Sequence, residues 1–360
     1  MSEYGRRDFL KQAGLSALGT AVAWKAMAAG ATAADAPIRL ALKGVSYTGT
    51  WYNGPALPIP QIIDRAKRFG YAAVEIDAKR PQAFPPDLDE GSREEIRKKL
   101  AETGVELAAV AAYNNFIEPI QEYFQMNLLV VREQLQLAHE LGAKILRVFA
   151  SWPMVATGKD GFGSQDLTRK WYADRTAHLS RQQRLDLAIG ALKELAPRAE
   201  ECGVTMALQN HPPGIQAYGD VLEILDRVGS PQVKACIDLQ NLQKGENVRQ
   251  AVLDTGSRQV HAHFGGEFRR GQDGRLECFL MNADFPGYVQ ALLEIGYRGF
   301  LSFEFCHRCV QRDAAGNKLS NELAGIDRVD EQIQLARDFM HQVVAEAKAQ
   351  ELRNPTLRPC

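Results

Sequence analysis

The stretch RQQRLDLAIGALKELAPRAEECGVTMALQN (181–210) contains the unit from which the fold is built. Apolar residues recur with a helical period up to Cys202, and Gly203 follows as the expected C-cap of that helix. The nearly continuous apolar run VTMALQN (204–210) comes next. Because a strand without polar alternation is buried on both faces, as in parallel sheets, this stretch predicts a helix that leads into a buried parallel strand.

The same unit repeats along the chain. Eight short apolar runs are expected to form strands: IRLALKGV (38–45), AAVEI (72–76), VELAAVAA (105–112), AKILRVFA (143–150), VTMALQN (204–210), VKACID (233–238), QVHAHF (259–264) and GFLSFEF (299–305). Helical segments separate them, and several end in a glycine just before the next strand: Gly70, Gly104, Gly142 and Gly203. This alternation predicts an α/β fold, a single-domain (β/α)8 TIM barrel over residues 34–350 with a tail at 351–360. A doubly wound open sheet is the alternative, but it needs a glycine-rich phosphate turn that LKGVSYTGTW (42–51) does not supply.

The composition is that of an ordinary globular protein of 360 residues, with 45% apolar and 24% charged residues. It excludes collagen, a disordered chain and a miniature scaffold held by disulfides. The formal net charge is −1, so no nucleic-acid partner is expected. After the N-terminal segment no run reaches the ~20 apolar residues of a membrane span, so no stable membrane anchor is expected.

The N-terminus has the features of an export signal. Arg6 and Arg7 precede a weakly apolar, Ala/Gly-rich stretch that ends in an Ala-Thr-Ala tripeptide (31–33). Paired arginines in this setting predict a twin-arginine signal peptide over residues 1–33, removed before Ala34, and a periplasmic or secreted protein. There are two alternatives: cleavage three residues later, after Ala36, or an ordinary N-terminal helix in place of a signal peptide.

Polar residues lie at the ends of several predicted strands, where a TIM barrel builds its active site. They are Glu75, Arg147, Gln209, His211, Asp238, His261, His263 and Glu304. Residues two apart on a strand share a face, so the two histidines of HAH (261–263) point the same way. The last four strands offer an amide, a carboxylate, an imidazole and a carboxylate, in that order. We expect these groups to form a cage for one divalent cation, and such ligands suit Mn²⁺, Mg²⁺, Co²⁺ or Zn²⁺. There are alternative interpretations of these residues: Asp238 caps a helix, and the histidines are ordinary core residues.

Six fragments occur in an order that resembles a known family: GYAAVEI, AKILRVFA, MALQNH, ACID, VHAHFGGEFRR and GYRGFLSFEF. The chain is similar over residues 38–347 to the xylose-isomerase-like TIM-barrel superfamily, which includes sugar-phosphate isomerases and epimerases and endonuclease IV. The resemblance implies that one metal is held by four residues: Gln209, Asp238, His263 and Glu304. It also implies that Arg269, six residues past the metal-binding histidine, contacts a substrate oxygen. In the epimerases of this family two glutamates move a proton through a metal-held enediolate.

The sequence departs from the family pattern at two positions. The fifth strand offers Gln209 rather than glutamate, and Asn241 stands where epimerases often have histidine. An amide oxygen can ligate a metal but cannot accept a proton from the substrate. The expected acid/base residues are therefore Glu304, His211 and Glu75.

Substrate contacts are expected from strand ends and from the loops beyond them. The loops after the first, third and fourth strands (47–60, 113–124 and 151–163) are rich in glycine, proline and aromatic residues. In a barrel they lie over the active face. The expected substrate-binding residues are Arg147, Trp152, His261 and Arg269.

The expected function is a metal-dependent isomerase or epimerase acting on a non-phosphorylated sugar or keto-sugar derivative, because export removes the protein from most sugar phosphates. Two alternatives remain: a keto-glycoside lyase or hydratase with a single base, and a non-catalytic carbohydrate-binding barrel. A DNA phosphodiesterase is disfavoured by the acidic mature chain. Cys306 and Cys309 could form a disulfide in an oxidising periplasm. The sequence leaves open whether the protein is a homo-oligomer.

Overall fold

The computed structural model describes residues 38–152, 154–313 and 315–353, and these residues form one barrel. The proposed signal peptide, its cleavage site and the end of the tail lie outside the described residues. The eight barrel strands are β1 (Arg39–Lys43), β2 (Ala73–Asp77), β3 (Glu106–Ala111), β4 (Ile145–Phe149), β7 (Thr205–Gln209), β8 (Val233–Cys236), β9 (Ala262–Phe264) and β12 (Phe300–Phe303). Seven of them lie within the segments predicted for them, and β2 extends one residue beyond its predicted segment, to Asp77.

The strands pair in parallel in the order β8-β7-β4-β3-β2-β1-β12-β9. The first strand pairs with the last, β1 with β12, and a parallel bridge from Ala235 to Gln259 joins the two outer strands. The sheet is therefore curled into a nearly closed barrel. The predicted TIM barrel is confirmed, and the doubly wound open sheet is excluded.

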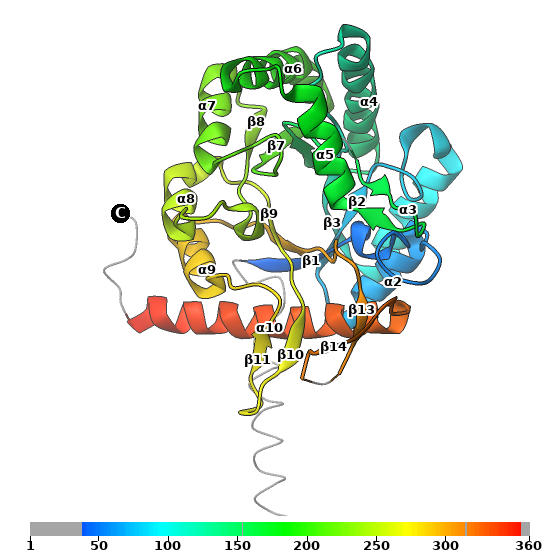
Figure 1. Cartoon of the computed structure of the whole chain (residues 1–360), viewed down its shortest axis with the longest axis vertical. Coiled ribbons are helices and arrows are strands. Elements are labelled where there is room, and N and C mark those ends of the chain that lie inside the picture. The colour runs from blue at the N-terminus through cyan, green and yellow to red at the C-terminus, as the bar shows by residue number, and fades with distance from the viewer. Residues whose placement is uncertain (1–37, 153, 314, 354–360) are drawn as a thin grey trace, which may run out of the picture.

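Eight helices connect these strands and surround the sheet (Figure 1). They are α2 (Ile59–Phe69), α3 (Glu90–Thr103), α4 (Gln121–Glu140), α6 (Arg181–Cys202), α7 (Tyr218–Val228), α8 (Val248–Thr255), α9 (Phe285–Glu294) and α10 (Ile326–Arg353). Ser180 and Gln183 form a capping box at the start of α6, and Gly203 ends it with a φ of 62°. Among the described residues no helix is both long and apolar enough to cross a membrane.

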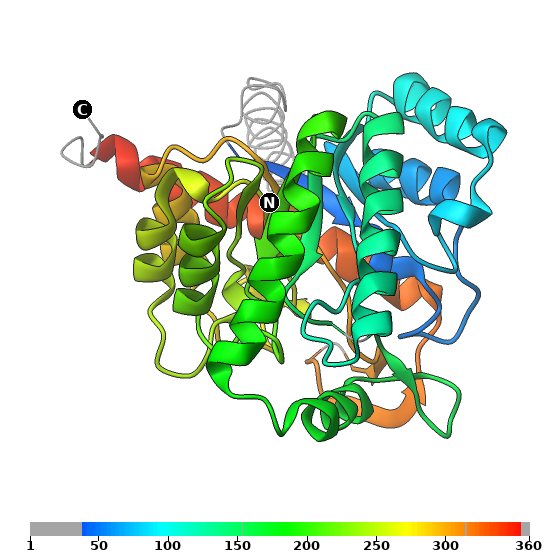
Figure 2. The same ribbon diagram turned by 90° about the horizontal axis from the view of Figure 1, so that it is seen from above.

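Additional elements lie at the end of the barrel where the strands finish. A small hairpin, β5 (Ala156–Thr157) and β6 (Gly163–Ser164), follows β4 and leads into α5 (Gln165–Thr176). Two further hairpins follow β9 and β12: β10 (Phe268–Arg270) with β11 (Leu276–Cys278), and β13 (Val310–Arg312) with β14 (Lys318–Leu323). Figure 2 shows α5 and the orange β13–β14 segment at the same end of the molecule. The expected loops over the active face are present, and the two later hairpins were not predicted.

Candidate active site

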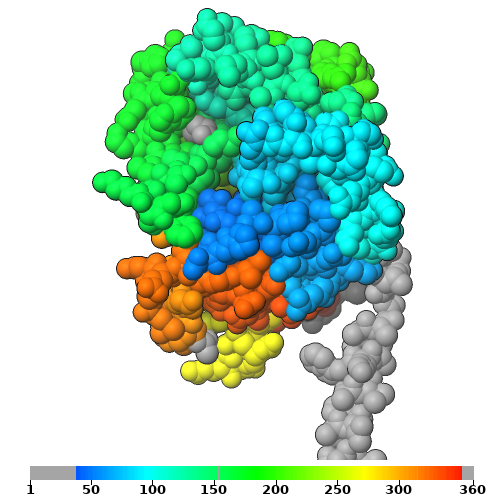
Figure 3. Space-filling model, turned by 90° about the vertical axis from the view of Figure 1, so that its right-hand side faces the viewer, coloured from blue at the N-terminus to red at the C-terminus, as the bar shows by residue number. Residues whose placement is uncertain are grey.

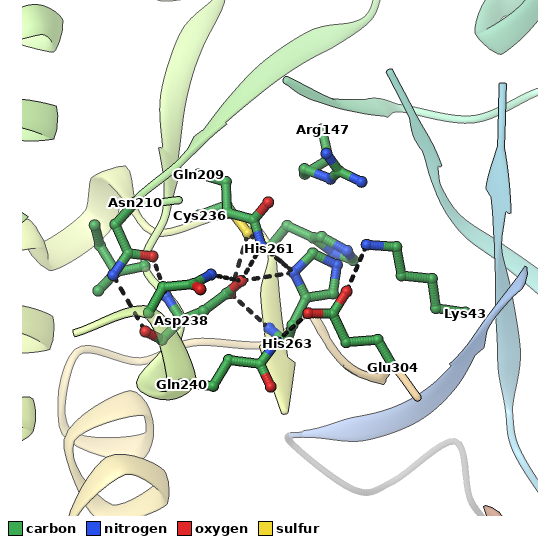
Figure 4. A network of polar contacts seen from close by, with 12 residues as sticks. Lys43, Arg147, Gln209, Asn210, Cys236, Asp238, Gln240, His261, His263 and Glu304 are labelled. Atoms are coloured by element: carbon green, nitrogen blue, oxygen red, sulfur yellow. Dashed lines mark hydrogen bonds and ion pairs between the residues drawn. The ribbon is translucent and has the colours of Figure 1, made fainter. Parts of the chain in front are cut away.

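A cluster of buried charged and polar side chains fills the end of the barrel where the strands finish (Figure 4). Its members are Lys43, Glu75, Arg147, Gln209, Asn210, Asp238, His261, His263 and Glu304, all of them buried. Burying a charge costs free energy unless it is paired, so each of these groups needs a partner inside the cluster.

The imidazole of His263 joins two carboxylates at the centre of the cluster. Its Nδ1 lies 2.9 Å from Asp238 Oδ2, and its Nε2 lies 2.7 Å from Glu75 Oε2. The same Glu75 oxygen lies 2.8 Å from His261 Nε2. Burial lowers the pKa of His263, but Asp238 and Glu75 outweigh that effect and raise it well above its usual value. His263 is thus held between Glu75 and Asp238, and Glu75 also contacts His261.

Gln209 contacts two of the other residues proposed as metal ligands. Its Nε2 donates to Asp238 Oδ2 and lies 3.2 Å from His263 Nδ1. Its Oε1 is buried and has no hydrogen-bond partner among the described residues. An orphaned acceptor of this kind is costly unless a group outside the protein satisfies it.

Lys43, the last residue of β1, was missed by the sequence analysis. Its Nζ donates to Glu304 Oε2 at 2.7 Å and lies 3.6 Å from Glu75 Oε1. Burial lowers the pKa of Lys43, but Glu304 and Glu75 raise it above its usual value, so the amine is an ammonium. For Glu304 burial raises the pKa, whereas Lys43 and His263 lower it, so the side chain is a carboxylate. The rule applied to the other strand ends would have found this lysine.

Arg147 brings a second permanent positive charge into the barrel. The side chain is fully buried, and its guanidinium carbon lies 4.0 Å from the ring centroid of Phe149. Its Nη1 donates to Ala112 O at 3.2 Å, whereas Nε and Nη2 have no hydrogen-bond partner among the described residues, although Nε lies 3.9 Å from Glu75 Oε1. The predicted substrate-binding arginine therefore has free donors.

A small cavity of about 40 Å³ opens above this cluster. The sequence-predicted residues that line it are Arg147, Trp152, Gln209, His211 and Glu304, and Lys43, Lys79 and Cys306 line it as well. His211 packs edge-on against Trp152, with ring centroids 4.5 Å apart. Burial lowers the pKa of His211 to about 4, with a smaller lowering from Arg147, so near neutral pH it is a neutral imidazole. Lys79 was also missed, and burial lowers its pKa to about 8.

Five of the predicted residues do not line the cavity. Asp238 and His263, two of the proposed metal ligands, are fully buried in the cluster and are not among the residues that line the cavity. Glu75 and His261 are fully buried beneath it and are not among its lining residues. Arg269 lies on the β10–β11 hairpin, where its Nε is 2.6 Å from Glu277 Oε1, and it does not line the cavity either. Asn241 lies close to the cluster, with its Nδ2 3.4 Å from Asp238 Oδ2.

The two closely spaced cysteines are both free thiols in the structure. Cys306 lines the cavity, whereas Cys309 is buried, and its backbone N–H donates to Trp51 O at 2.8 Å. The structure therefore shows no disulfide between these two described residues.

The fold and the strand-end cluster define a (β/α)8 barrel with a buried polar site at the ends of its strands, and a family model agrees with this fold. The model for the xylose isomerase-like TIM barrel matches residues 63–329. Because this match covers most of the chain, the protein belongs to the xylose isomerase-like TIM barrel family. The resemblance inferred from the strand fragments is confirmed at this level.

Relatives within this fold include sugar epimerases. D-psicose 3-epimerase of Enterocloster bolteae is 28% identical over 134 residues, which are 36% of this chain and 42% of that protein. The match thus spans less than half the length of that relative. The structure of D-psicose 3-epimerase with D-tagatose from Clostridium cellulolyticum H10 has a TM-score of 0.64 at 18% identity, covering 85% of this chain and 99% of that one. The IOLI protein with a bound zinc atom has a TM-score of 0.60 at 17% identity, covering 86% and 99%.

Proposed function

We propose that this protein is a sugar isomerase or epimerase that moves a proton at a carbon next to a carbonyl group. The observation that carries the proposal is the pairing of Glu304 and Lys43 at the cavity, with Nζ and Oε2 2.7 Å apart. A buried carboxylate beside a buried ammonium supplies a base and an acid at one place. The similarity to D-psicose 3-epimerase supports the same class of reaction.

In the proposed reaction Glu304 removes the proton from the carbon next to the carbonyl. The electron pair of the C–H bond forms a C=C bond, and the carbonyl π electrons move to oxygen. Lys43 donates a hydrogen bond to that oxygen. Nε and Nη2 of Arg147, which have no hydrogen-bond partner among the described residues, are available to other oxygens of the sugar. An isomer forms when Glu304 returns the proton to the former carbonyl carbon and the hydroxyl proton of the α-carbon passes to the former carbonyl oxygen. An epimer forms when a second group delivers a proton to the opposite face of the α-carbon, and the cavity wall offers His211 for this role.

A single divalent cation, manganese, magnesium, cobalt or zinc, is part of this proposal. The residues that would hold it are Gln209, Asp238, His263 and Glu304. The orphaned Gln209 Oε1 and the 2.9 Å approach of Asp238 Oδ2 to His263 Nδ1 support three of these donors. Among the described residues two groups have potential ligand atoms within 4.8 Å of one another: Glu75 with His261 and His263, and Cys236 with Asp238 and His263. Neither group includes Glu304. When bound, the cation would polarise the carbonyl and stabilise negative charge on its oxygen.

A single-base lyase or hydratase acting on a keto-glycoside is the second candidate. The observation that favours it is the composition of the cavity wall. Glu304 is the one carboxylate among the described residues that line the cavity, and Gln209 stands where a second base is needed. His211, neutral near neutral pH, is then the remaining group for a second proton transfer.

Solvent exchange tests the proposed function. The protein, supplied with Mn²⁺, is incubated in D₂O with ketohexoses and with 3-keto-glucosides, and NMR follows both products and deuterium at each carbon. We expect deuterium at a single carbon next to the carbonyl together with an isomer or epimer. Loss of the glycosidic substituent with no epimer would favour the lyase. Absence of both exchange and turnover with every sugar would leave a carbohydrate-binding barrel and refute the enzyme.

Replacing Gln209 with glutamate is expected to tighten metal binding. The substitution adds a negative charge to the proposed donor set, and we expect Kd for Mn²⁺ to fall by about tenfold, which corresponds to about 1.4 kcal/mol. Isothermal titration with Mn²⁺ measures this change. Gln165→Glu is the matched control, because Gln165 also lines the cavity but lies on α5, outside the donor set. Equal effects of the two substitutions would contradict the assignment of Gln209 as a ligand.

We also propose that the protein is exported by the twin-arginine pathway, because Arg6 and Arg7 precede the Ala/Gly-rich segment. Mass spectrometry of the protein from the periplasm of a host with this pathway is expected to give an N-terminus near Ala34. Replacing both arginines with lysines is expected to abolish export. Recovery of the uncleaved chain in the cytoplasm of that host would contradict the proposal.

A further inference from the structure

A second hollow lies beside the proposed catalytic cavity and shares two of its walls, Tyr113 and Trp152. Its volume is about 270 Å³, whereas the cavity around Glu304 measures about 40 Å³. Its walls come from the segment after β3, the start of α4, the segment after β4 and helix α5. Figure 3 shows one face of the molecule, which is hollowed between the green segments and the teal and blue segments.

The hollow has open aromatic faces. Tyr123 on α4 is 48% exposed and Trp171 on α5 is 43% exposed, although both line a concave surface. The guanidinium of Arg175 lies 4.7 Å from the ring centroid of Trp171 and 5.6 Å from that of Tyr123. Large aromatic side chains exposed together in a hollow indicate a binding surface.

Polar groups lie between these aromatic faces. Arg175 Nη2 donates to Glu118 Oε1 at 2.7 Å, and Asn115 Nδ2 donates to Glu118 Oε2 at 3.3 Å. Arg175 Nε is buried and has no hydrogen-bond partner among the described residues. A buried donor of this kind is costly to leave unpaired, so a ligand oxygen that accepted its proton would be stabilised.

The hollow and the catalytic cavity are neighbours, and a third hollow borders both. This third hollow, of about 480 Å³, shares Met154 with the aromatic one and shares Lys79 and Val155 with the cavity. An extended molecule with one end at Glu304 and the other end between Tyr123 and Trp171 would lie along this third hollow.

From these walls we infer that the hollow is a subsite for a second sugar ring, and that the substrate is a di- or oligosaccharide rather than a free monosaccharide. A pyranose ring has apolar C–H faces that stack on aromatic rings and hydroxyl groups at its edge that pair with guanidinium, amide and carboxylate groups. The walls of the hollow offer both kinds of contact. The inference rests on the proposed function, because it assigns the first ring to the site at Glu304.

The subsite is tested by calorimetry on a variant that is expected to turn over slowly, so that binding is measured without reaction. The Glu304→Gln variant is titrated with cellobiose, maltose and lactose, and with their constituents glucose and galactose. We expect at least one disaccharide to bind about tenfold or more tightly than its monosaccharides. Adding Trp171→Ala is expected to remove this advantage and to leave monosaccharide binding unchanged. Leu167→Ala, on the same helix and 46% exposed but outside the hollow, is the matched control and is expected to change neither.

Several outcomes would overturn the subsite. One is that no disaccharide binds more tightly than its constituent monosaccharides. Another is that Trp171→Ala weakens the binding of disaccharides and monosaccharides equally. Tighter binding of p-nitrophenyl glucoside than of any disaccharide would assign the hollow to an aryl group instead. A change of molar mass on Trp171→Ala, measured by light scattering, would assign the surface to a second copy of the chain. Disaccharide binding that depends on Trp171 in a protein without turnover would refute the proposed function and leave the subsite standing.

Discussion

Replacing Glu304 with glutamine is expected to reduce kcat by about 10²–10⁴-fold, the usual contribution of a positioned acid/base group. The amide has nearly the same shape, and its oxygen can still accept the hydrogen bond that Lys43 donates at 2.7 Å. The amide of the variant cannot remove a proton from carbon. The loss is measured as turnover and, independently, as the rate at which deuterium enters the substrate from D₂O, and both rates are expected to fall together.

Glu267 provides the control for this substitution. It is another buried carboxylate, but it lies outside the cavity, where its Oε2 is 3.0 Å from Arg312 Nε. Glu267→Gln is expected to lower the melting temperature and to retain kcat within a few-fold, which separates a loss of stability from a loss of catalysis. If Glu304→Gln retained kcat within tenfold, Glu304 would not be the base, and His211 would be the next residue to replace.

Replacing Lys43 with methionine is expected to affect both stability and rate. The side chain is 3% exposed, and removing it leaves the Glu304 carboxylate buried without its cation. Breaking a buried ion pair on one side typically costs about 3–5 kcal/mol of unfolding free energy. We also expect kcat to fall by about 10²-fold, because the oxygen that becomes negative during proton transfer loses a donor. Urea unfolding and turnover measure the two effects.

A double substitution distinguishes pairing from packing at this position. Lys43→Met combined with Glu304→Gln removes both charges, so the double variant is expected to be more stable than Lys43→Met by itself. If the two free-energy changes simply added, the contact would carry no coupling and the ion pair would not explain the burial of Lys43. Lys43→Arg keeps the charge and is expected to recover most of the lost stability.

The local features of the barrel could be predicted from the sequence. Strand β7 follows α6 at the position that the run VTMALQN and the preceding Gly203 indicated. Such features depend on hydrophobic periodicity and capping within about twenty neighbouring residues, so they can be recognised without knowledge of the rest of the chain. The hairpins β10–β11 and β13–β14 were missed because their strands are short and partly exposed, which leaves little apolar alternation to detect.

The candidate site was predicted in part. The rule that barrel sites lie at strand ends led to Gln209, Asp238, His263 and Glu304, and the structure places all four in or beside one buried cluster. The same rule did not show which of the polar residues at the strand ends line the cavity. Glu75 lies beneath it and bridges two histidines, and Arg269 turns toward Glu277 within its own hairpin.

The sequence by itself determined the eightfold alternation of strand and helix, the end of the barrel that carries the polar residues, and the family. Only the tertiary structure decided that Lys43 pairs with Glu304, 261 positions away in the chain, and that Tyr123 and Trp171 face the same hollow. The physical reason is the range of the interactions. Helix and strand periodicity is a property of adjacent residues, whereas the ionic state and the partner of a buried charge depend on which distant side chains share its poorly solvated surroundings.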